Sequence, residues 1–412
     1  HEKDVREIFN RYDLDAVTIG RIIEGHDYIL EHDGEEVCHI PVSTLTDDVL
    51  EEPSTEREPQ RLQTAREEPV WQPVVNEPGQ VLRQLLQQAT IASDEVLTQQ
   101  YDSQVRTSTV VGPGSDAGVI RIRGYHKGLA MTTDGNGRFV YLDPEIGGQM
   151  AVTEAYLNIV ASGAEPLAIT DCLNYGDPND PEIFWELHHS IEGMATACCI
   201  FDTPVISGNV SLYNENNGRA IYPTPMVGMV GLIKNLDHVI SSFATHAGDD
   251  VYLIGQTGND YAGSELQKLM TGQISGTLSK VNLQRIQEYC GRLHSEMVAG
   301  HVTAAHDVSE GGLGVAFAEM LFAGKTGMNL DLRDLTAPQL FSETAGRMVV
   351  TVPTAFKKEF ENVMGNDARW VGTVTNTHWL EGHLQGADFN EDLAELKREY
   401  KEALPCQLKL KD

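Results

Sequence analysis

Asp171 and the run SGNVSLYNE at residues 207–215 combine residue types that suit a metal–nucleotide site. Gly208 would let a backbone N–H approach a phosphate closely, because glycine has no side chain. Asn209 offers a hard amide oxygen suited to Mg²⁺, and Ser211 offers a hydroxyl for a phosphate or a substrate. Asp171 would add a carboxylate from the end of a separate strand. These residues predict phosphate and metal chemistry.

A turn is the alternative interpretation of this run, since short stretches of Gly, Asn and Ser are common in turns. The preceding residues favour a site. TPVI at 203–206 is a short apolar run typical of a strand that is buried on both faces. Polar, glycine-bearing residues that directly follow such a strand commonly bind ligands in α/β proteins.

Composition limits the classes of function. The chain has 412 residues, enough for two or three domains, and its formal net charge is −31, which argues against nucleic-acid binding because such proteins need a basic surface. Its six cysteines are scattered, which favours free thiols in a reducing cytosol. No apolar stretch approaches membrane-spanning length, and the charged residues 1–12 do not resemble a signal peptide. We therefore expect a cytoplasmic protein without a membrane contact.

The first eighty residues predict an incomplete domain and a connection. Two strands joined by a short turn are expected at 16–22 and 28–41, and they cannot hold a core alone. The proline-rich residues 43–80 are expected to form an extended linker. AVTIGRI at 16–22 resembles RWVGTVT at 369–375, which suggests that the chain opens with the tail of a duplicated domain.

Beyond residue 80 the pattern predicts a mixed α/β (α+β) fold. Strands are expected near 118–123, 128–132, 166–171, 203–209, 224–233, 251–255 and 341–353, and helices near 81–90, 148–162, 181–200 and 390–404. A further strand, a Gly-rich turn and a helix are expected over 301–321. Its glycines 311, 312 and 314 either hold an anion at the start of the helix or let the helix pack closely.

Residues 132–148 leave two interpretations open. Asp134 and Asn136 suit Mg²⁺, and Arg138 has the geometry to bind a phosphate with two hydrogen bonds. The same stretch is equally compatible with a long hairpin loop of ordinary turn formers. The chain has no GxxxxGK[ST], HExxH or GxSxG motif, and no cysteine in a glutaminase-type elbow.

Several long motifs together resemble one family. GPGSDAGV, TTDGNGRFVYLDP, SGAEPLAITDCLNYG, TPVISGNVSLYNE, AHDVSEGGL and FSETAGRMVV occur in one order between residues 92 and 353. In this order they resemble the carboxy-terminal half of the large subunit of phosphoribosylformylglycinamidine synthase, within the aminoimidazole ribonucleotide synthetase-like superfamily. Residues 9–42 resemble the end of that family's first half.

The resemblance implies a fold and a division of the chain. Residues 1–42 would be the tail strands of a preceding carboxy-terminal domain, and residues 43–80 would be the linker. Residues 81–240 would form an amino-terminal-type α/β domain whose strands meet those of the first half in a barrel. Residues 241–412 would form a carboxy-terminal-type α/β domain.

The resemblance also implies an activity and site residues. The family uses ATP and ammonia to convert formylglycinamide ribonucleotide to the amidine in purine synthesis. Asp171 and Gly208 match positions that contact ATP, Asn209 matches a Mg²⁺ ligand, and Ser211 matches a substrate contact. The family's catalytic histidines lie in the first half, so no catalytic residue is assigned in this chain. A further, non-catalytic nucleotide is implied for this half, with Asp134, Asn136 and Arg138 as candidates for its margin.

The implied partners are the missing first half, a glutaminase subunit and a small bridging subunit. Two alternatives remain open. The chain could belong to another ATP-using member of the superfamily, such as aminoimidazole ribonucleotide synthetase or the selenophosphate or thiamine phosphate kinases. It could also be a scaffold half that holds partner subunits and a structural nucleotide.

Overall fold

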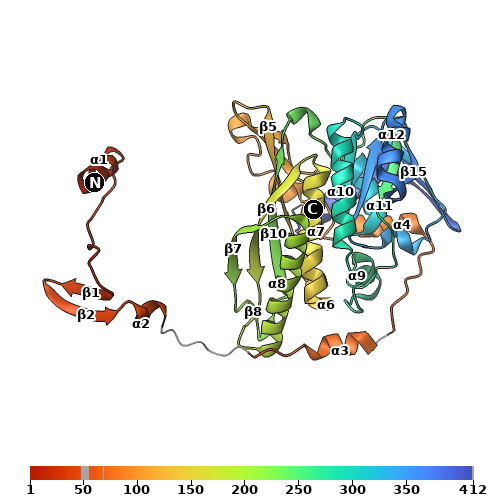
Figure 1. Cartoon of the computed structure of the whole chain (residues 1–412). Coiled ribbons are helices and arrows are strands. Elements are labelled where there is room, and N and C mark those ends of the chain that lie inside the picture. Colours follow the sequence, from red (N-terminus) through yellow and green to blue (C-terminus); the bar gives the residue numbers. More distant parts are fainter. Residues whose placement is uncertain (48–54, 68, 411–412) are drawn as a thin grey trace. The chain divides into compact units, whose positions relative to one another are not determined.

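The computed structural model describes residues 1–47, 55–67 and 69–410. The chain separates into two compact units, His1–Ser54 and Thr55–Asp412 (Figure 1). The described part of the first unit contains helix α1 (Glu2–Arg11), the antiparallel strands β1 (Asp27–His32) and β2 (Glu35–Pro41), and the short helix α2 (Ser43–Thr46).

The hairpin β1–β2 corrects the prediction for this unit. Residues 16–22 form no strand, and both strands come from the segment 28–41. Asp33 and Gly34, at the tip, have φ values of 51° and 83°, as a two-residue hairpin turn requires. None of the described residues 1–47 is buried, which agrees with the expectation that this segment cannot form a core alone.

The predicted linker is not extended throughout its described part. Helix α3 (Gln60–Glu67) lies within it, and we call the described residues 55–67 and 69–77 the strap. Arg61 of α3 lies 3.8 Å from the ring centroid of Tyr141 and forms an ion pair with Glu186. Proline limits helix length here, but arginine still provides contacts that fix the segment to the protein surface.

A six-stranded sheet occupies the first half of the second unit. Its order is β3 (Thr109–Val111), β4 (Gly118–Ile122), β5 (Lys127–Asp134), β10 (Thr224–Ile233), β6 (Glu165–Asn174) and β7 (Val205–Ser211). Neighbouring strands are antiparallel except β6 and β7, which are parallel. A small hairpin, β8 (Glu215–Asn216) and β9 (Arg219–Ala220), follows β7.

Two long helices, α7 (Pro144–Ala161) and α8 (Pro181–Phe201), pack on each other, and α7 covers β5, β6 and β10 (Figure 1). Each begins with an Asp–Pro pair. The side chains of Asp143 and Asp180 accept hydrogen bonds from backbone N–H groups of the first turn, and proline suits the first helical position. These caps fix where each helix starts relative to the sheet.

A seven-stranded sheet occupies the second half of this unit. Its order is β12 (Ala304–Val308), β14 (Arg347–Val352), β11 (Asp250–Ile254), β15 (Ala368–Thr375), β13 (Gly327–Leu332), β16 (Trp379–Leu384) and β17 (Ala387–Asp392). Both sheets are open in the described part of the chain.

The remaining helices include α6 (Gly137–Leu142), which packs against α7, α8 and β10. The others are α4 (Pro78–Leu86), α5 (Glu95–Thr98), α9 (Glu265–Thr271), α10 (Leu283–Val298), α11 (Gly312–Leu321), α12 (Lys357–Met364) and α13 (Leu393–Gln407). Short 3₁₀ turns lie at Val105–Thr107, Leu236–His238, Pro338–Phe341, Thr354–Phe356 and Gly365–Asp367. Most elements expected beyond residue 80 are present, but 132–148 is not a hairpin loop, because β5, α6 and the start of α7 divide it.

One hydrophobic core cluster joins the two sheets. It contains Ile159 and Val160 of α7 together with Leu293 of α10 and Met348 of β14. Because α7 also contacts β12, side chains at the ends of β5 and β12 are brought together across this junction. All six cysteines lie among the described residues as free thiols. None of the described helices combines the length and hydropathy that crossing a membrane requires.

Candidate functional site

The parallel pairing of β6 and β7 brings the four predicted site residues to one edge of the first sheet. Asp171 is the register partner of Gly208, and the next pairs place Asn209 beside Cys172 and Ser211 beside Asn174. Asp171 does come from a separate strand, as predicted, but it lies inside β6 and not at its end, because the strand continues to Asn174.

Asp171 and Gly208 are in close contact. A Cβ atom at position 208 would collide with the Asp171 carboxylate, so only glycine fits without a shift. Burial raises the pKa of Asp171, while the backbone N–H of Asn209, which donates to it, acts in the opposite direction. The carboxylate therefore lies against the backbone of the exposed strand β7.

Asn209 and Ser211 point to the same face of β7, because alternate residues of a strand do so. The Asn209 amide nitrogen lies 3.4 Å from Ser211 Oγ and 3.7 Å from Cys172 Sγ. Its hydrogen bonds in the described part of the chain use the nitrogen, so the amide oxygen is available to a ligand. An exposed amide oxygen beside a hydroxyl is suited to a hydrated cation or a phosphate.

Two expectations about this run are wrong. Residues 207–211 lie inside β7 and form neither a turn nor the residues after a strand. The strand is also not buried on both faces, since Val205 and Ile206 are 50% and 72% exposed. The reason is topological, because β7 is the last strand of its sheet and its outer edge has no neighbour among the described residues.

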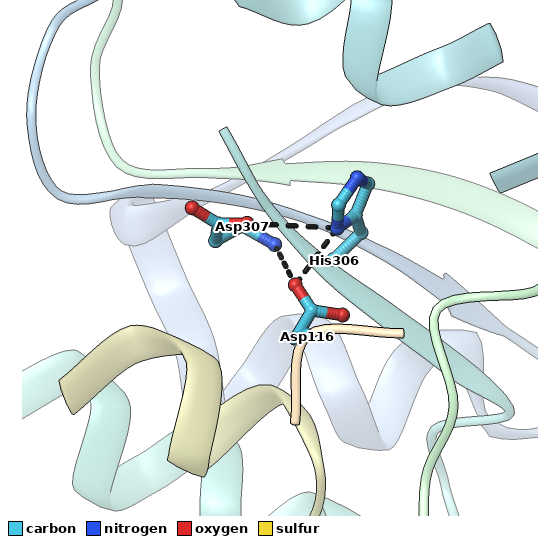
Figure 2. Close-up of side chains that lie close together, drawn as sticks. All are labelled: Asp116, His306 and Asp307. Atoms are coloured by element: carbon cyan, nitrogen blue, oxygen red, sulfur yellow. Dashed lines mark hydrogen bonds and ion pairs between the residues drawn. The ribbon is translucent and has the colours of Figure 1, made fainter. Parts of the chain in front are cut away.

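A second candidate site is a cluster of carboxyl groups at the junction of the two sheets. Figure 2 shows its centre, where Asp116 lies beside His306 and Asp307. Asp116 Oδ1 accepts from the Asp307 backbone N–H at 3.0 Å and lies 2.8 Å from His306 Nδ1. The other ring nitrogen of His306 is 3.2 Å from Glu319.

His306 is held as a cation by its acidic neighbours. Burial alone would lower the pKa of His306, but the charge and hydrogen bond of Asp116 outweigh burial and raise that pKa well above its ordinary value. Burial likewise opposes ionisation of Asp116, yet His306 keeps the pKa of this carboxyl below its ordinary value. The two residues form a buried ion pair.

The carboxyl groups around this ion pair outnumber the basic side chains near them. They are Asp134, Glu154, Asp307, Glu310 and Glu343. Burial raises the pKa of each, and their mutual repulsion adds to the effect; the pKa of Asp134 reaches about 7. Asp116 Oδ2 and Asn158 Oδ1 are buried without a hydrogen-bond partner in the described residues. This donor set of hard oxygens fits a divalent cation.

Of the residues 134, 136 and 138 named from the sequence, Asp134 belongs to this cluster, and Asn136 and Arg138 lie beside it. The Asp134 carboxylate accepts hydrogen bonds from Thr132 and Asn158, both at 2.8 Å. The Asn136 side chain caps α6 and donates to Glu310 at 2.8 Å. The Arg138 guanidinium is paired with buried Glu265, and its second terminal nitrogen forms no hydrogen bond with a described residue but lies 4.0 Å from Glu310 Oε1.

The glycines at the start of α11 serve close packing. At Gly312, with a φ of 67°, a Cβ would press on the carbonyl of Ser342. The Gly311 N–H, which faces the start of the helix, already donates to Glu343 Oε1 at 2.8 Å. A side chain of the protein therefore takes the place of an external anion.

Sequence reasoning did not single out Glu154, Asn158, His306, Asp307 or Glu343 as site residues. Glu154 and Asn158 carried a signal, because they are two polar residues one turn apart in the largely apolar second half of α7. The others come from strand ends and turns that are distant in sequence, so only the fold assembles them.

Comparisons with known proteins place this fold in a family. The model of the AIR synthase related protein, N-terminal domain, matches residues 114–233, and that of the C-terminal domain matches residues 246–384. Phosphoribosylformylglycinamidine synthase subunit PurL of Limosilactobacillus reuteri is 64% identical over 412 residues, which are 100% of this chain and 56% of that protein.

Solved structures agree on the fold. T. maritima PurL complexed with FGAR superposes with a TM-score of 0.65 and 17% identity, over 79% of this chain and 54% of that one. T. maritima PurL complexed with ATP has a TM-score of 0.58 and 24% identity, over 90% and 53%. The chain spans about half the length of the curated relatives it matches. The chain belongs to the AIR synthase related proteins and, within them, to the family of phosphoribosylformylglycinamidine synthase subunit PurL.

Proposed function

We propose that the chain forms one half of an ATP-dependent carbon–nitrogen ligase of purine biosynthesis. The reaction converts formylglycinamide ribonucleotide and ammonia to formylglycinamidine ribonucleotide, with ATP cleaved to ADP and phosphate. The observation that carries the proposal is the β6–β7 edge, where Asp171, Gly208, Asn209 and Ser211 are aligned on neighbouring strands of a chain 64% identical to a PurL subunit.

Each residue of this edge has a proposed role. Asp171 and the backbone at Gly208 position ATP, which the close contact between them supports. Asn209 holds Mg²⁺ through its free amide oxygen, and Ser211 contacts the substrate. Bound Mg²⁺ would neutralise phosphate charge as the amide oxygen is activated. Because Asn209 provides a single donor, the other ligands must come from the nucleotide or from the first half.

The domain organisation is part of the proposal. Residues 1–42 are the tail of the preceding domain, 43–80 the connection, 81–240 the ATP-binding domain and 241–412 the carboxy-terminal domain. The open edge at β7 supports a barrel completed by strands of the first half, since an apolar strand edge without a neighbour favours pairing with another strand. The proton-transferring groups belong to that first half.

Ammonia must be supplied by partners. A separate glutaminase subunit and a small bridging subunit are proposed, and a Thermotoga maritima structure named PurLQS supports partner subunits in this family. A complete protein that consumed glutamine without an added subunit would contradict this part of the proposal.

The central test restores the first half and compares two asparagine variants. Asn209→Ala is expected to lower kcat at least about tenfold and to raise the Mg²⁺ concentration for half-activity, because it removes a metal ligand. Asn390→Ala is the matched control, since Asn390 is also an exposed asparagine on an edge strand, β17. Equal activity of Asn209→Ala and the unmodified protein would contradict the metal role and favour a scaffold.

A structural nucleotide is a second candidate function, favoured by the acidic cluster. Buried carboxyl groups with raised pKa values, together with unpartnered Asp116 Oδ2 and Asn158 Oδ1, support Mg²⁺–ADP bound near Asp134. Calorimetry with ADP and Mg²⁺ on this chain tests it. Binding is expected to release protons, so the heat should depend on the ionisation enthalpy of the buffer. No binding, or binding without proton release, would exclude this candidate.

A further inference from the structure

A cavity of about 410 Å³ lies beside the second sheet. Its walls are the loop 255–263, the segment 275–282 and the turn 343–346, and Trp71 of the strap lies at its rim against Tyr261, with ring centroids 6.3 Å apart. This volume is within the range of small-molecule sites. None of Asp171, Gly208, Asn209 and Ser211 lines it, and of the acidic cluster only Glu343 does.

The inner wall carries a carboxyl group whose second oxygen has no partner. Glu343 is 6% exposed, and its Oε1 accepts from the backbone N–H groups of Glu265 and Gly311, both at 2.8 Å. Its Oε2 is buried without a hydrogen bond to any described residue, although Glu343 lines the cavity. This oxygen is therefore free to form a hydrogen bond with a polar group of a ligand.

The polar wall beside Glu343 is rigidly held. Thr344 Oγ1 accepts from the Gly258 N–H at 2.9 Å and donates to Asp260, whose other carboxylate oxygen accepts from Ser279. Behind them the guanidinium of Arg347 is fully buried and donates to the Thr344 carbonyl at 2.9 Å. Groups fixed in this way are prepared for binding before a ligand arrives.

The outer end of the cavity is cationic. Lys280 is exposed and has no ion-pair partner among the described residues, although the chain as a whole is strongly acidic. Ser275 and Thr277 add hydroxyl groups on either side of Gly276, which has a φ of 97°. A flexible ammonium group beside hydroxyls is suited to a phosphate group.

We propose that this cavity binds a small phosphate monoester whose other end carries hydroxyl or carbonyl oxygens, with Lys280 at the phosphate and Glu343 at the opposite end. A free anion would use only the outer end, and a neutral sugar only the inner wall. Because Lys280 and Glu343 line the same cavity, a ligand that carries both groups can use both residues. This site goes beyond the proposed function and does not depend on it.

Calorimetry on this chain with ribose 5-phosphate as the probe tests the proposal. Ribose 5-phosphate is expected to bind at least about tenfold more tightly than ribose or inorganic phosphate, since each of these lacks one of the two contacts. Lys280→Ala should weaken the binding by about tenfold or more. Lys358→Ala is the matched control, because Lys358 is an exposed lysine on α12 outside the cavity.

Two further variants test the inner wall of the cavity and its independence from the β6–β7 edge. Glu343→Gln keeps the volume of the side chain and an acceptor for the two N–H groups but replaces the free oxygen Oε2 with an amide NH₂ group, and it should also weaken the binding of ribose 5-phosphate. Asn209→Ala should leave the affinity unchanged, because Asn209 is not in the cavity. The proposal is wrong if ribose 5-phosphate does not bind, if phosphate binds equally well, or if Lys280→Ala and Lys358→Ala behave alike.

Discussion

The Asp171 carboxylate lies where a side chain at position 208 would be, and there is room for it only because residue 208 is glycine. A methyl group at position 208 would collide with the Asp171 carboxylate and displace it from the edge of the sheet. Gly208→Ala in the restored full-length protein is therefore expected to weaken ADP–Mg²⁺ binding at least about tenfold, with little change in thermal stability. Isothermal titration calorimetry would measure the affinity.

Gly291→Ala is the control for that substitution. Gly291 is exposed in α10, and a Cβ there would meet no atom within 4 Å. It should bind the nucleotide like the unmodified protein and gain about 0.5–1 kcal/mol of stability, because alanine favours a helix over glycine. If both variants kept full affinity, the space at Gly208 would have no role in binding.

Asp134 and Glu343 make stability depend on pH. Burial raises their pKa values to about 7 and about 8, whereas carboxyl groups of an unfolded chain titrate near pH 4. Between these values the folded state keeps protons that the unfolded state has released, so stability falls as pH rises. We expect the Tm in metal-free buffer to decrease from about pH 5 to about pH 8, with the decrease diminished by Mg²⁺.

Glu343→Gln removes one of the two groups and should flatten this dependence, as measured by thermal unfolding monitored by circular dichroism. Glu359→Gln on α12 provides the control, because Glu359 is exposed and should leave the slope unchanged. A Tm that rises with pH in the unmodified protein would show that the cluster is ionised in the fold.

Single elements were predictable to the extent that their own residues determine them. The apolar spacing located α7 and α8, although the expected start at residue 148 lies inside α7, which begins at Pro144 after the cap Asp143. The alternation of β10 gives a regular pattern of burial. The exposure of β7 was not predictable, because apolar residues such as Val205 and Ile206 are equally compatible with a central strand and with an edge strand. The position of a strand in its sheet depends on which other strands pair with it, and those strands lie far away in the sequence.

Arg83 connects three elements. Its guanidinium binds Glu391 at the end of β17 and Glu395 and Glu399 of α13, at 2.6, 2.9 and 2.8 Å. Substitution Arg83→Ala leaves three carboxylates close together without a cation, so we expect a loss of about 1–3 kcal/mol in the free energy of unfolding by urea.

The control is Arg398→Ala, which removes an exposed arginine of α13 and should change stability by less than about 0.5 kcal/mol. The stability lost by Arg83→Ala is expected to be smaller at high salt, because the Arg83 side chain is 26% exposed and salt screens its charge. Equal stability of the two variants would mean that the three ion pairs contribute nothing net.

On the scale of the whole molecule, the site residues divide into two kinds. Asp171, Gly208, Asn209 and Ser211 come from two motifs that were recognisable in the sequence and that pair as neighbouring strands. The acidic cluster joins β5, α7 and β12 across the junction of two sheets, and no local pattern predicts that junction. Gly208 and Asn209 are exposed, whereas Asn158, Asp307 and Glu343 are buried. This contrast is consistent with one site that awaits a partner surface and one that this chain builds alone.

The open edge of β7 gives the prediction that tests the whole arrangement. In the described residues β7 pairs only with β6, and Val205, Ile206 and Val210 are 50%, 72% and 53% exposed. If strands of the first half complete a barrel there, backbone amides of β7 should exchange hydrogen at least about tenfold more slowly in the full-length protein than in this chain. Amides of β11, a central strand, should exchange at the same rate in both. Hydrogen exchange with mass spectrometry measures this difference, and equal exchange of β7 in the two proteins would place the first half elsewhere.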